Sequence, residues 1–195
     1  TMASALEMYF MGCGLFGDGF RPPIRVIHAF PQLELAAAYS KTKLNQIISS
    51  SITLPITDPS KKPMSCMQAL LDKSTATNDS LHFKQFAGGN HLWIESVGLD
   101  GDRIMGRTAD VLFFDEVQKT TSMAIGNSLK VLTTAKYGKP TKGVQVYFGT
   151  PRRKGSDYHK MWQTSSQQYF HLGCERCEKH FPLYTPGSDD WEKIW

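Results

Sequence analysis

The chain has 195 residues, of which 41% are hydrophobic and 21% are charged, an ordinary globular composition that argues against disorder. Its net charge of +4 permits a nucleic-acid partner without demanding one, no apolar run reaches the roughly 18 residues of a membrane span, and no signal peptide is evident. Four cysteines, two isolated and two in a C-x-x-C pair, argue against a disulfide framework and suit a reducing compartment.

The first half of the chain predicts a helix, a buried strand, a second helix and a β-hairpin. Good helix formers fill residues 2–12, and a loop with glycines and prolines follows them. Residues 24–30 form a short apolar run with β-branched members, which is typical of a buried strand. Apolar residues then recur at helical spacing from 33 to about 50. Residues 81–86 and 91–96, joined by Gly88-Gly89-Asn90, predict a hairpin.

The second half alternates strands with helices. Residues 110–114 form a near-continuous apolar run, the pattern of a central parallel strand, and residues 144–148 predict another buried strand. Helical patterns cover residues 122–135 and 156–164, and from residue 168 onward the sequence changes to aromatics, cysteines and turns. Strands that alternate with helices predict an α/β fold with a mainly parallel sheet.

The strongest chemical signal is a pair of acids, Asp115 and Glu116, that directly follows the apolar run of residues 111–114. A buried parallel strand presents its carboxyl end to the crevice in which open α/β sheets bind ligands. A carboxylate there can hold Mg²⁺, and a second one beside it can orient or deprotonate an attacking water. We therefore predict Asp115 as the metal residue and Glu116 as the catalytic base of a Walker B strand. Two solvated acids at the end of an ordinary strand are the alternative.

Three further blocks, in chain order with this strand, resemble the terminase large subunits of tailed phages over about residues 1–165. They are residues 24–31 with the helix that follows, residues 103–110 and residues 144–152. The resemblance implies a three-layer α/β core of the P-loop NTPase, helicase-like kind. It implies a motor that hydrolyses ATP with Mg²⁺ to pump double-stranded viral DNA into a procapsid. It also implies that Gly149-Thr150-Pro151 is the coupling motif, whose Thr150 senses the γ-phosphate; a plain turn is the alternative.

The family usually has an arginine just before the glycine that precedes its Walker B strand, where it acts as a finger on the γ-phosphate. Here Met105 occupies that position, and Arg103 and Arg107 lie on either side of it. Either arginine could serve as the finger. A solvated or DNA-facing arginine is the alternative for each.

The phosphate-binding Walker A loop, G-x-x-x-x-G-K-[ST], does not occur in the sequence. In the family, a helix rich in small and apolar residues follows this loop directly, and residues 2–11 match that helix. We therefore interpret the chain as a fragment that begins at or just after the Walker A hydroxyl residue, with Thr1 as a candidate for that Mg²⁺ ligand. The fragment alone is expected to bind ATP poorly, and the family's nuclease domain is expected beyond residue 195.

Cys174 and Cys177 have the spacing of two ligands of one tetrahedral zinc ion. They predict that residues 166–195 are the start of a zinc ribbon, since some terminases of the lambda type carry a cysteine-rich insert after the coupling motif. The other two ligands would be His171 and His180, or a second C-x-x-C pair beyond Trp195. A reduced surface pair or a redox dithiol is the alternative.

Basic residues Arg152, Arg153 and Lys154 adjoin the coupling turn, where a translocase would grip the phosphate backbone of DNA without reading its sequence. A solvated loop face is the alternative. The resemblance further implies a terminase small subunit and a portal protein as partners, a homo-oligomeric ring, no membrane, and a location in the host cell cytoplasm. Two other functions stay open: a superfamily-2 helicase-like DNA-dependent ATPase, and a non-catalytic zinc-ribbon module that binds DNA.

Overall fold

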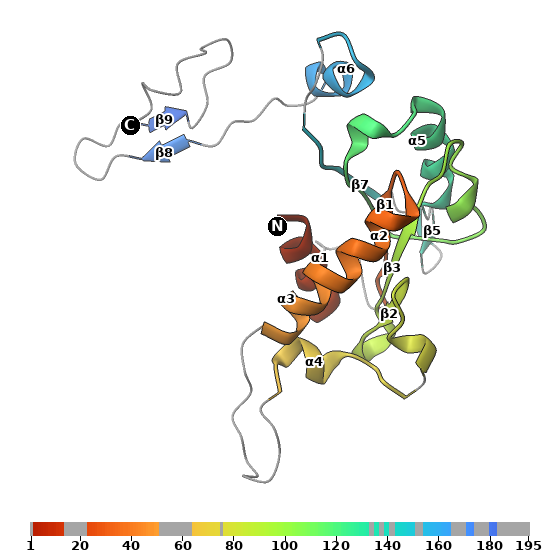
Figure 1. Ribbon diagram of the computed structural model, residues 1–195, viewed down its shortest axis with the longest axis vertical. Helices are drawn as coiled ribbons and strands as arrows, with labels where there is room; N and C mark the ends of the chain where they lie inside the picture. The colour runs from red at the N-terminus through yellow and green to blue at the C-terminus, as the bar shows by residue number, and fades with distance from the viewer. Residues whose placement is uncertain are drawn as a thin grey trace. The chain divides into compact units, whose positions relative to one another are not determined.

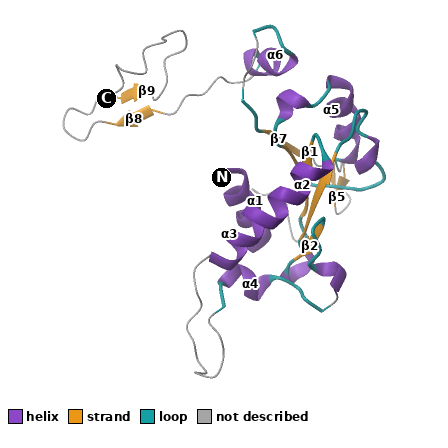
Figure 2. Cartoon of the chain, viewed as in Figure 1, coloured by secondary structure: helices purple, strands orange, loops and turns teal. Residues whose placement is uncertain are grey.

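A computed structural model describes residues 2–13, 23–50, 64–74, 76–132, 135–136, 139–140, 143–150, 154–164, 171–173 and 180–182. The contacts divide the chain into two compact units, Thr1–Arg152 and Arg153–Trp195. Figures 1 and 2 trace the elements in chain order and by type. The division of the chain into domains at residue 165, which the sequence suggests, stays a prediction.

The first unit is built on a sheet with the strand order β2-β3-β1-β4-β7. Strands β3, β1, β4 and β7 run parallel to one another, and β2 pairs antiparallel with β3. The middle of the sheet is formed by β1 (Arg25–Phe30) and β4 (Val111–Phe114), and every residue of β4 is buried. The prediction of a central parallel strand is confirmed, because a strand that is covered on both faces can bury consecutive apolar side chains.

The other elements of the first unit connect and flank these strands. A helix α1 spans Met2–Cys13, and a continuous helix after β1 consists of α2 (Leu33–Ala38), a π-helical segment η2 (Tyr39–Leu44) and α3 (Asn45–Ser50). The further elements are α4 (Cys66–Leu70), β2 (Phe83–Gln85), β3 (His91–Ser96), α5 (Ser122–Ser128), β7 (Val144–Tyr147), the short strands β5 (Ala135–Lys136) and β6 (Lys139–Pro140), and the 3₁₀ turns η3 (Ala76–Asn78), η4 (Ala87–Gly89), η5 (Asp102–Ile104), η6 (Val117–Lys119) and η7 (Leu129–Val131).

The second unit contains α6 (Asp157–Gln163) and two antiparallel strands, β8 (His171–Gly173) and β9 (His180–Pro182). The Ser156 side chain caps α6 by accepting the amide of His159. The helix predicted over residues 156–164 is confirmed. Of the helices that the structure describes in either unit, none is both long and apolar enough to cross a membrane.

Helices lie on both faces of the sheet, and Figure 1 shows α1 and α3 on one side of it and α5 on the other. Alternate residues of the strands face the first side, where Val26, Leu92 and Phe113 pack in one core with the buried residues of α1 and of the long helix. The opposite residues, among them Ile27 and Leu112, are also fully buried. This arrangement is the mixed α/β fold that the alternation of strands and helices predicts.

One predicted helix is shorter than expected. The pattern over residues 122–135 predicts a single helix, but α5 ends at Ser128 and tightens into η7, which ends at Val131. The following residue, Leu132, forms a parallel bridge with Ala109, and the carbonyl of Val131 accepts the amide of Ala109 at 2.8 Å. The backbone of Val131 and Leu132 is therefore bonded to the segment before β4 and cannot continue the helix. This tertiary contact overrides the helix propensity of the sequence.

A partly buried ion pair fixes the amino ends of the two central strands. The Asp110 side chain is 1% exposed and accepts hydrogen bonds from the Arg25 amide at 2.9 Å and from Arg25 Nε and Nη2, each at 3.3 Å. The amide of Asp110 in turn donates to the Arg25 carbonyl at 2.8 Å. These contacts set the register of β4 against β1, and therefore also the level at which β4 ends.

Replacing Asp110 by alanine is expected to lower the free energy of unfolding by about 2 kcal/mol, because the guanidinium of Arg25 and one amide lose their buried acceptor. Urea unfolding of the chain measures the change. The matched control is Asp102→Ala, at an exposed position in the same unit, with an expected change within about 0.5 kcal/mol. Equal effects of the two substitutions would contradict this role of Asp110.

Candidate functional site at the carboxyl edge of the sheet

The four parallel strands end at one edge of the sheet, and the acidic pair lies in the middle of that edge. The register aligns Ala29 of β1 with Phe114 of β4, so that Asp115 follows at the level of Phe30. Along the chain, β1 leads to β3 on one side, and β4 leads to β7 on the other. Such a reversal between adjacent strands is the switch point at which open α/β sheets bind ligands.

Asp115 is positioned at this switch point by hydrogen bonds of its amide and of one carboxylate oxygen. Its amide donates to the Ala29 carbonyl at 3.0 Å, and its Oδ1 accepts the Glu116 amide at 2.9 Å. Its Oδ2 lies 3.8 Å from Nε2 of His28, and the side chain is 27% exposed. A partly exposed carboxylate supplies the oxygen ligands that Mg²⁺ prefers, so this residue fits a magnesium ligand.

Glu116 adopts a backbone conformation that residues other than glycine rarely adopt. Its φ is 51°, and it is the one non-glycine residue with positive φ in the part of the chain that the structure describes. The cause is local: the Asp115 amide is bonded to β1, while the Val117 amide donates to the carbonyl of Phe148, just after β7, at 3.0 Å. Residue 116 must reverse the chain between these two anchors. Strain of this kind costs roughly 1–3 kcal/mol and is concentrated at functional sites.

Gln118 connects the Glu116 carboxylate to the predicted coupling turn. Its Nε2 donates to Glu116 Oε2 at 2.9 Å, and its Oε1 accepts the Thr150 amide at 3.2 Å. Lys119 Nζ also lies 2.8 Å from Glu116 Oε2. Gln118 carries no sequence signal that marks it as a site residue. Only the ability of its amide group to donate and accept at the same time could have suggested a bridging role.

The two candidate arginine fingers both contact β3, which is separated from β4 by β1. Arg103 Nη1 donates to Oγ of Ser96, the last residue of β3, at 3.0 Å. Arg107 Nη2 donates to Glu95 Oε1 at 2.6 Å, and its guanidinium lies 5.3 Å from the centroid of the Trp93 ring. Arg107 is thus engaged by an ion pair and a cation–π contact, whereas Arg103, in η5, is exposed and contacts the carboxyl end of β3.

A cavity of about 460 Å³ opens at the carboxyl ends of β1 and β3. Its walls come from the last residue of β3 and from the segments that follow these two strands: Pro31, Gln32, Leu33, Glu34, Ser96, Gly98, Leu99, Asp100 and Arg103. Asp115 and Glu116 do not line it. The cavity therefore lies beside the acidic pair at the same edge of the sheet.

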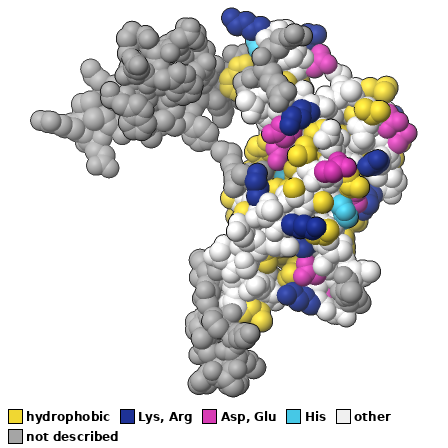
Figure 3. All heavy atoms as spheres, viewed as in Figure 1, with side chains coloured by type: hydrophobic (Ala, Val, Ile, Leu, Met, Phe, Trp, Pro, Cys, Tyr) yellow, Lys and Arg dark blue, Asp and Glu magenta, His cyan; other side chains and the backbone are white. Residues whose placement is uncertain are grey.

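Several predicted site residues lie outside the described residues: Thr1, Arg152, Arg153, Cys174 and Cys177. Lys154 is described and exposed. On the face that Figure 3 shows, the acidic and basic side chains of the described residues are intermixed. Among the described residues, no group of three or more histidine, cysteine or acidic side chains could hold a metal ion. The zinc site and the DNA contacts therefore stay predictions.

Comparison with known proteins bears on the family and the fold of the chain. The sequence model of the phage terminase large subunit gpA ATPase domain matches residues 20–194. A structure of the large terminase from a thermophilic bacteriophage is 15% identical, with a TM-score of 0.50, and the match covers 83% of this chain and 33% of that one. A second crystal form of that terminase, in complex with ADP, is 14% identical with a TM-score of 0.45, and the match covers 76% and 29% of the two chains.

At this identity the first of the two structures supports the fold alone, and the chain spans about a third of the length of that terminase. No curated protein matches the chain.

The strain at residue 116 predicts an unusual order of stability. Glu116→Gly is expected to be more stable than Glu116→Ala by about 1 kcal/mol, because both lose the carboxylate but only glycine adopts a positive φ without steric cost. Urea unfolding of the two variants measures the difference. The control pair is Lys41→Gly and Lys41→Ala, at an exposed helical position, where glycine is expected to be the less stable by about 1 kcal/mol. The same order at both positions would refute strain at Glu116.

Proposed function

The chain belongs to the family of phage terminase large subunit gpA ATPase domains, and on this premise we propose that it forms the ATP-hydrolysing site of a DNA-packaging motor. The observation that carries the proposal is the position of Asp115 and Glu116 at the switch point of the parallel sheet. In the complete protein, the motor would move double-stranded viral DNA into a procapsid.

Asp115 would hold Mg²⁺ together with the nucleotide. When bound, the ion neutralises charge on the phosphates. The Asp115 carboxylate is kept at the sheet edge by the Ala29 and Glu116 contacts, so its orientation is set before the ligand arrives. Glu116 would orient the attacking water or accept its proton, since its carboxylate is 36% exposed and lies next to the metal residue. One of Arg103 and Arg107 would stabilise charge on the γ-phosphate, and Arg103 is the better placed.

The structural change that follows ATP hydrolysis would be transmitted through the turn at Gly149 and Thr150. Gln118 hydrogen-bonds both the Glu116 carboxylate and the Thr150 amide, so a displacement of either group changes the position of the other. We propose that these two hydrogen bonds of Gln118 couple the catalytic residue to the turn that the resemblance identifies as the coupling motif. Thr150 is exposed and would sense the γ-phosphate with its hydroxyl group.

The remaining parts of the proposal concern the complete protein. Arg152, Arg153 and Lys154 would contact the DNA backbone, and Cys174 with Cys177 would bind zinc as part of a ribbon. Thr1 would be the hydroxyl ligand of Mg²⁺. The partners would be the terminase small subunit and the portal protein, with the motor acting as a homo-oligomeric ring in the host cell cytoplasm and carrying a nuclease domain outside this chain.

Replacing the predicted base tests the proposed function directly. In the full-length protein, Glu116→Gln is expected to lower the ATP hydrolysis rate by roughly 10²–10⁴-fold, because the amide can neither accept the proton nor attract the water as strongly. ATP affinity, measured by calorimetry, is expected to stay within a few-fold of the parent value. Asp102→Asn serves as the exposed control. Hydrolysis at the parental rate in Glu116→Gln would disprove the catalytic role.

Removing the bridge is expected to slow turnover more than it weakens binding. In Gln118→Leu, both hydrogen bonds are lost at nearly constant volume. The rate constant kcat should therefore fall by about tenfold or more, the effect of one hydrogen bond to a charged group, with little change in KM for ATP. The matched control is Gln145→Leu, on β7, whose side chain bonds only the Tyr147 hydroxyl group among the described contacts. An equal loss in both variants would count against the bridge.

A further inference from the structure

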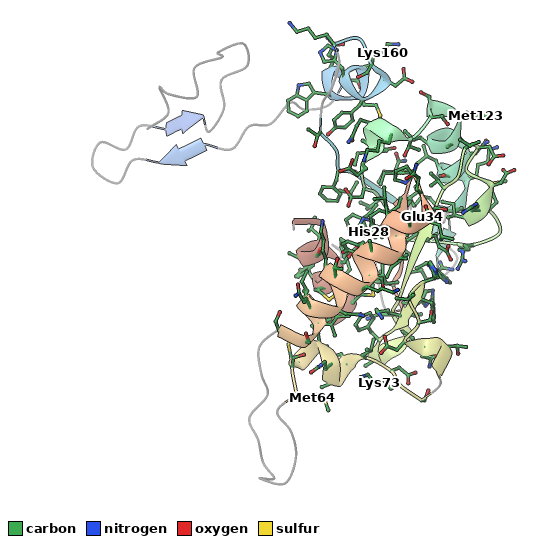
Figure 4. All side chains as sticks on the ribbon, in the orientation of Figure 1. His28, Glu34, Met64, Lys73, Met123 and Lys160 are labelled. Carbon is green, nitrogen blue, oxygen red and sulfur yellow. The ribbon has the colours of Figure 1, made fainter. Side chains whose placement is uncertain are left out.

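A line of polar side chains runs through the interior of the first unit and ends at Asp115. Glu7 on α1 and His28 on β1 are both 0% exposed, although every other residue on the inner part of β1 is apolar. Figure 4 labels His28, which lies in the interior of this unit. Burial of an ionisable group is unfavourable unless it is paired, so each of these side chains needs a partner.

These side chains lie next to one another in a row, and at His28 their contacts are ion-pair contacts without a hydrogen bond. His28 Nδ1 contacts Glu7 Oε1, and His28 Nε2 lies 3.8 Å from Asp115 Oδ2, so the imidazole ring stands between the two carboxylates. On the far side, the Tyr39 hydroxyl donates to Glu7 Oε2 at 2.5 Å and lies 3.0 Å from Ser4 Oγ. Burial, followed by the neighbouring Glu7 charge, raises the pKa of Tyr39, which keeps the hydroxyl protonated as a donor.

Packing leaves the His28 ring little freedom to turn. It stacks on Phe30 at 4.3 Å between centroids and meets the edge of Tyr39 at 4.6 Å, while Phe113 lies 5.9 Å away. A ring that is held in this way presents Nε2 to Asp115 in one direction. Replacing a buried polar pair with apolar residues is often neutral or stabilising, so stability gives only a weak reason for Glu7 and His28 at these positions.

We infer that Glu7 and His28 are positioning residues for the Asp115 carboxylate, and that Tyr39 holds Glu7 in place for this role. The inference rests on the proposed function, in which Asp115 binds Mg²⁺. The Glu116 amide already donates to Oδ1, and the His28 ring lies behind Oδ2 with Nε2 3.8 Å away, an electrostatic contact longer than a hydrogen bond, so the two groups together limit the rotation of the carboxylate. Groups that orient a metal ligand from behind typically change metal affinity by about 10–100-fold.

The same contacts connect Asp115 to α1. Ser4 and Glu7 are one helical turn apart on α1, and both contact the Tyr39 hydroxyl. A shift of α1 would therefore move the Glu7 carboxylate, the His28 ring and finally Asp115. This makes the metal residue sensitive to the position of a helix that has no backbone contact with β4 in the described hydrogen-bond pattern.

A double-mutant cycle in the full-length protein tests the inference. Affinity for Mn²⁺ in the presence of ADP, measured by electron paramagnetic resonance, is compared for the parent, Glu7→Gln, Asp115→Asn and the double variant. Glu7→Gln is expected to weaken Mn²⁺ binding by about tenfold when Asp115 is present, and to cause no further loss when residue 115 is asparagine. A purely structural effect of Glu7 would lower the affinity by the same factor in both backgrounds, and that result would overturn the inference.

Two further variants keep the test decisive. Asp79→Asn is the matched control, because it removes the charge from a carboxylate that forms a 2.6 Å ion pair with buried Lys84 of β2, a strand separated from β4 by β3 and β1; it should leave Mn²⁺ affinity unchanged. Should Glu7→Gln fail to fold, Tyr39→Phe decides, since it removes one hydroxyl group: a several-fold loss of affinity supports the inference, and no loss overturns it.

Failure of the two ideas can be told apart. If the parent protein neither binds Mn²⁺ with ADP nor hydrolyses ATP, the proposed function is wrong and the inference falls with it. If the parent does both and Glu7→Gln and Tyr39→Phe bind Mn²⁺ as the parent does, only the inference is wrong.

Discussion

The site depends on the pairing of β4 with β1 on one side and β7 on the other. This pairing uses the backbone of four residues whose side chains are all buried, so the strand cannot slide without exposing apolar surface on both faces. Backbone bonds continue past the end of the strand, from Asp115 to Ala29 and from Val117 to Phe148. Residues 115 and 116 are therefore confined to the carboxyl edge by main-chain bonds alone, before any contact of their own side chains.

Two adjacent acids acquire different surroundings from this constraint. The Asp115 carboxylate borders the interior, where His28 and Glu7 lie behind it. The chain reverses at Glu116, whose carboxylate instead contacts Gln118 and Lys119 near the turn after β7. One acid is thus connected to α1 and the other to Thr150. The different roles proposed for them, metal ligand and catalytic base, would follow from these surroundings, because the two carboxyl groups are otherwise of the same chemical kind.

The parts of the fold and the site that follow from local patterns could be predicted from the sequence. The apolar run before Asp115 predicts a strand that is buried on both faces, since such a strand accepts few other residue types, and the acids directly after the run mark the end of that strand. Contacts between distant segments could not be predicted. Glu7 and His28 lie in separate elements, and nothing in a helix of good formers or in an apolar strand indicates that they meet. The contact of Gln118 could not be predicted for the same reason, because its partner Thr150 lies after a different strand.

The π-helical segment Tyr39–Leu44 has a geometric consequence for the helix that contains it. The buried residues Ala36, Ser40, Leu44 and Ile48 recur every fourth position. In an uninterrupted α-helix, a spacing of four drifts about 40° per step, since each turn holds about 3.6 residues. The wider turn absorbs that drift and keeps both halves of the helix in phase. Deleting a single residue there would rotate Tyr39 by about 100° relative to the buried side of α3. The spacing of this segment thus constrains the packing as strictly as the identity of its side chains.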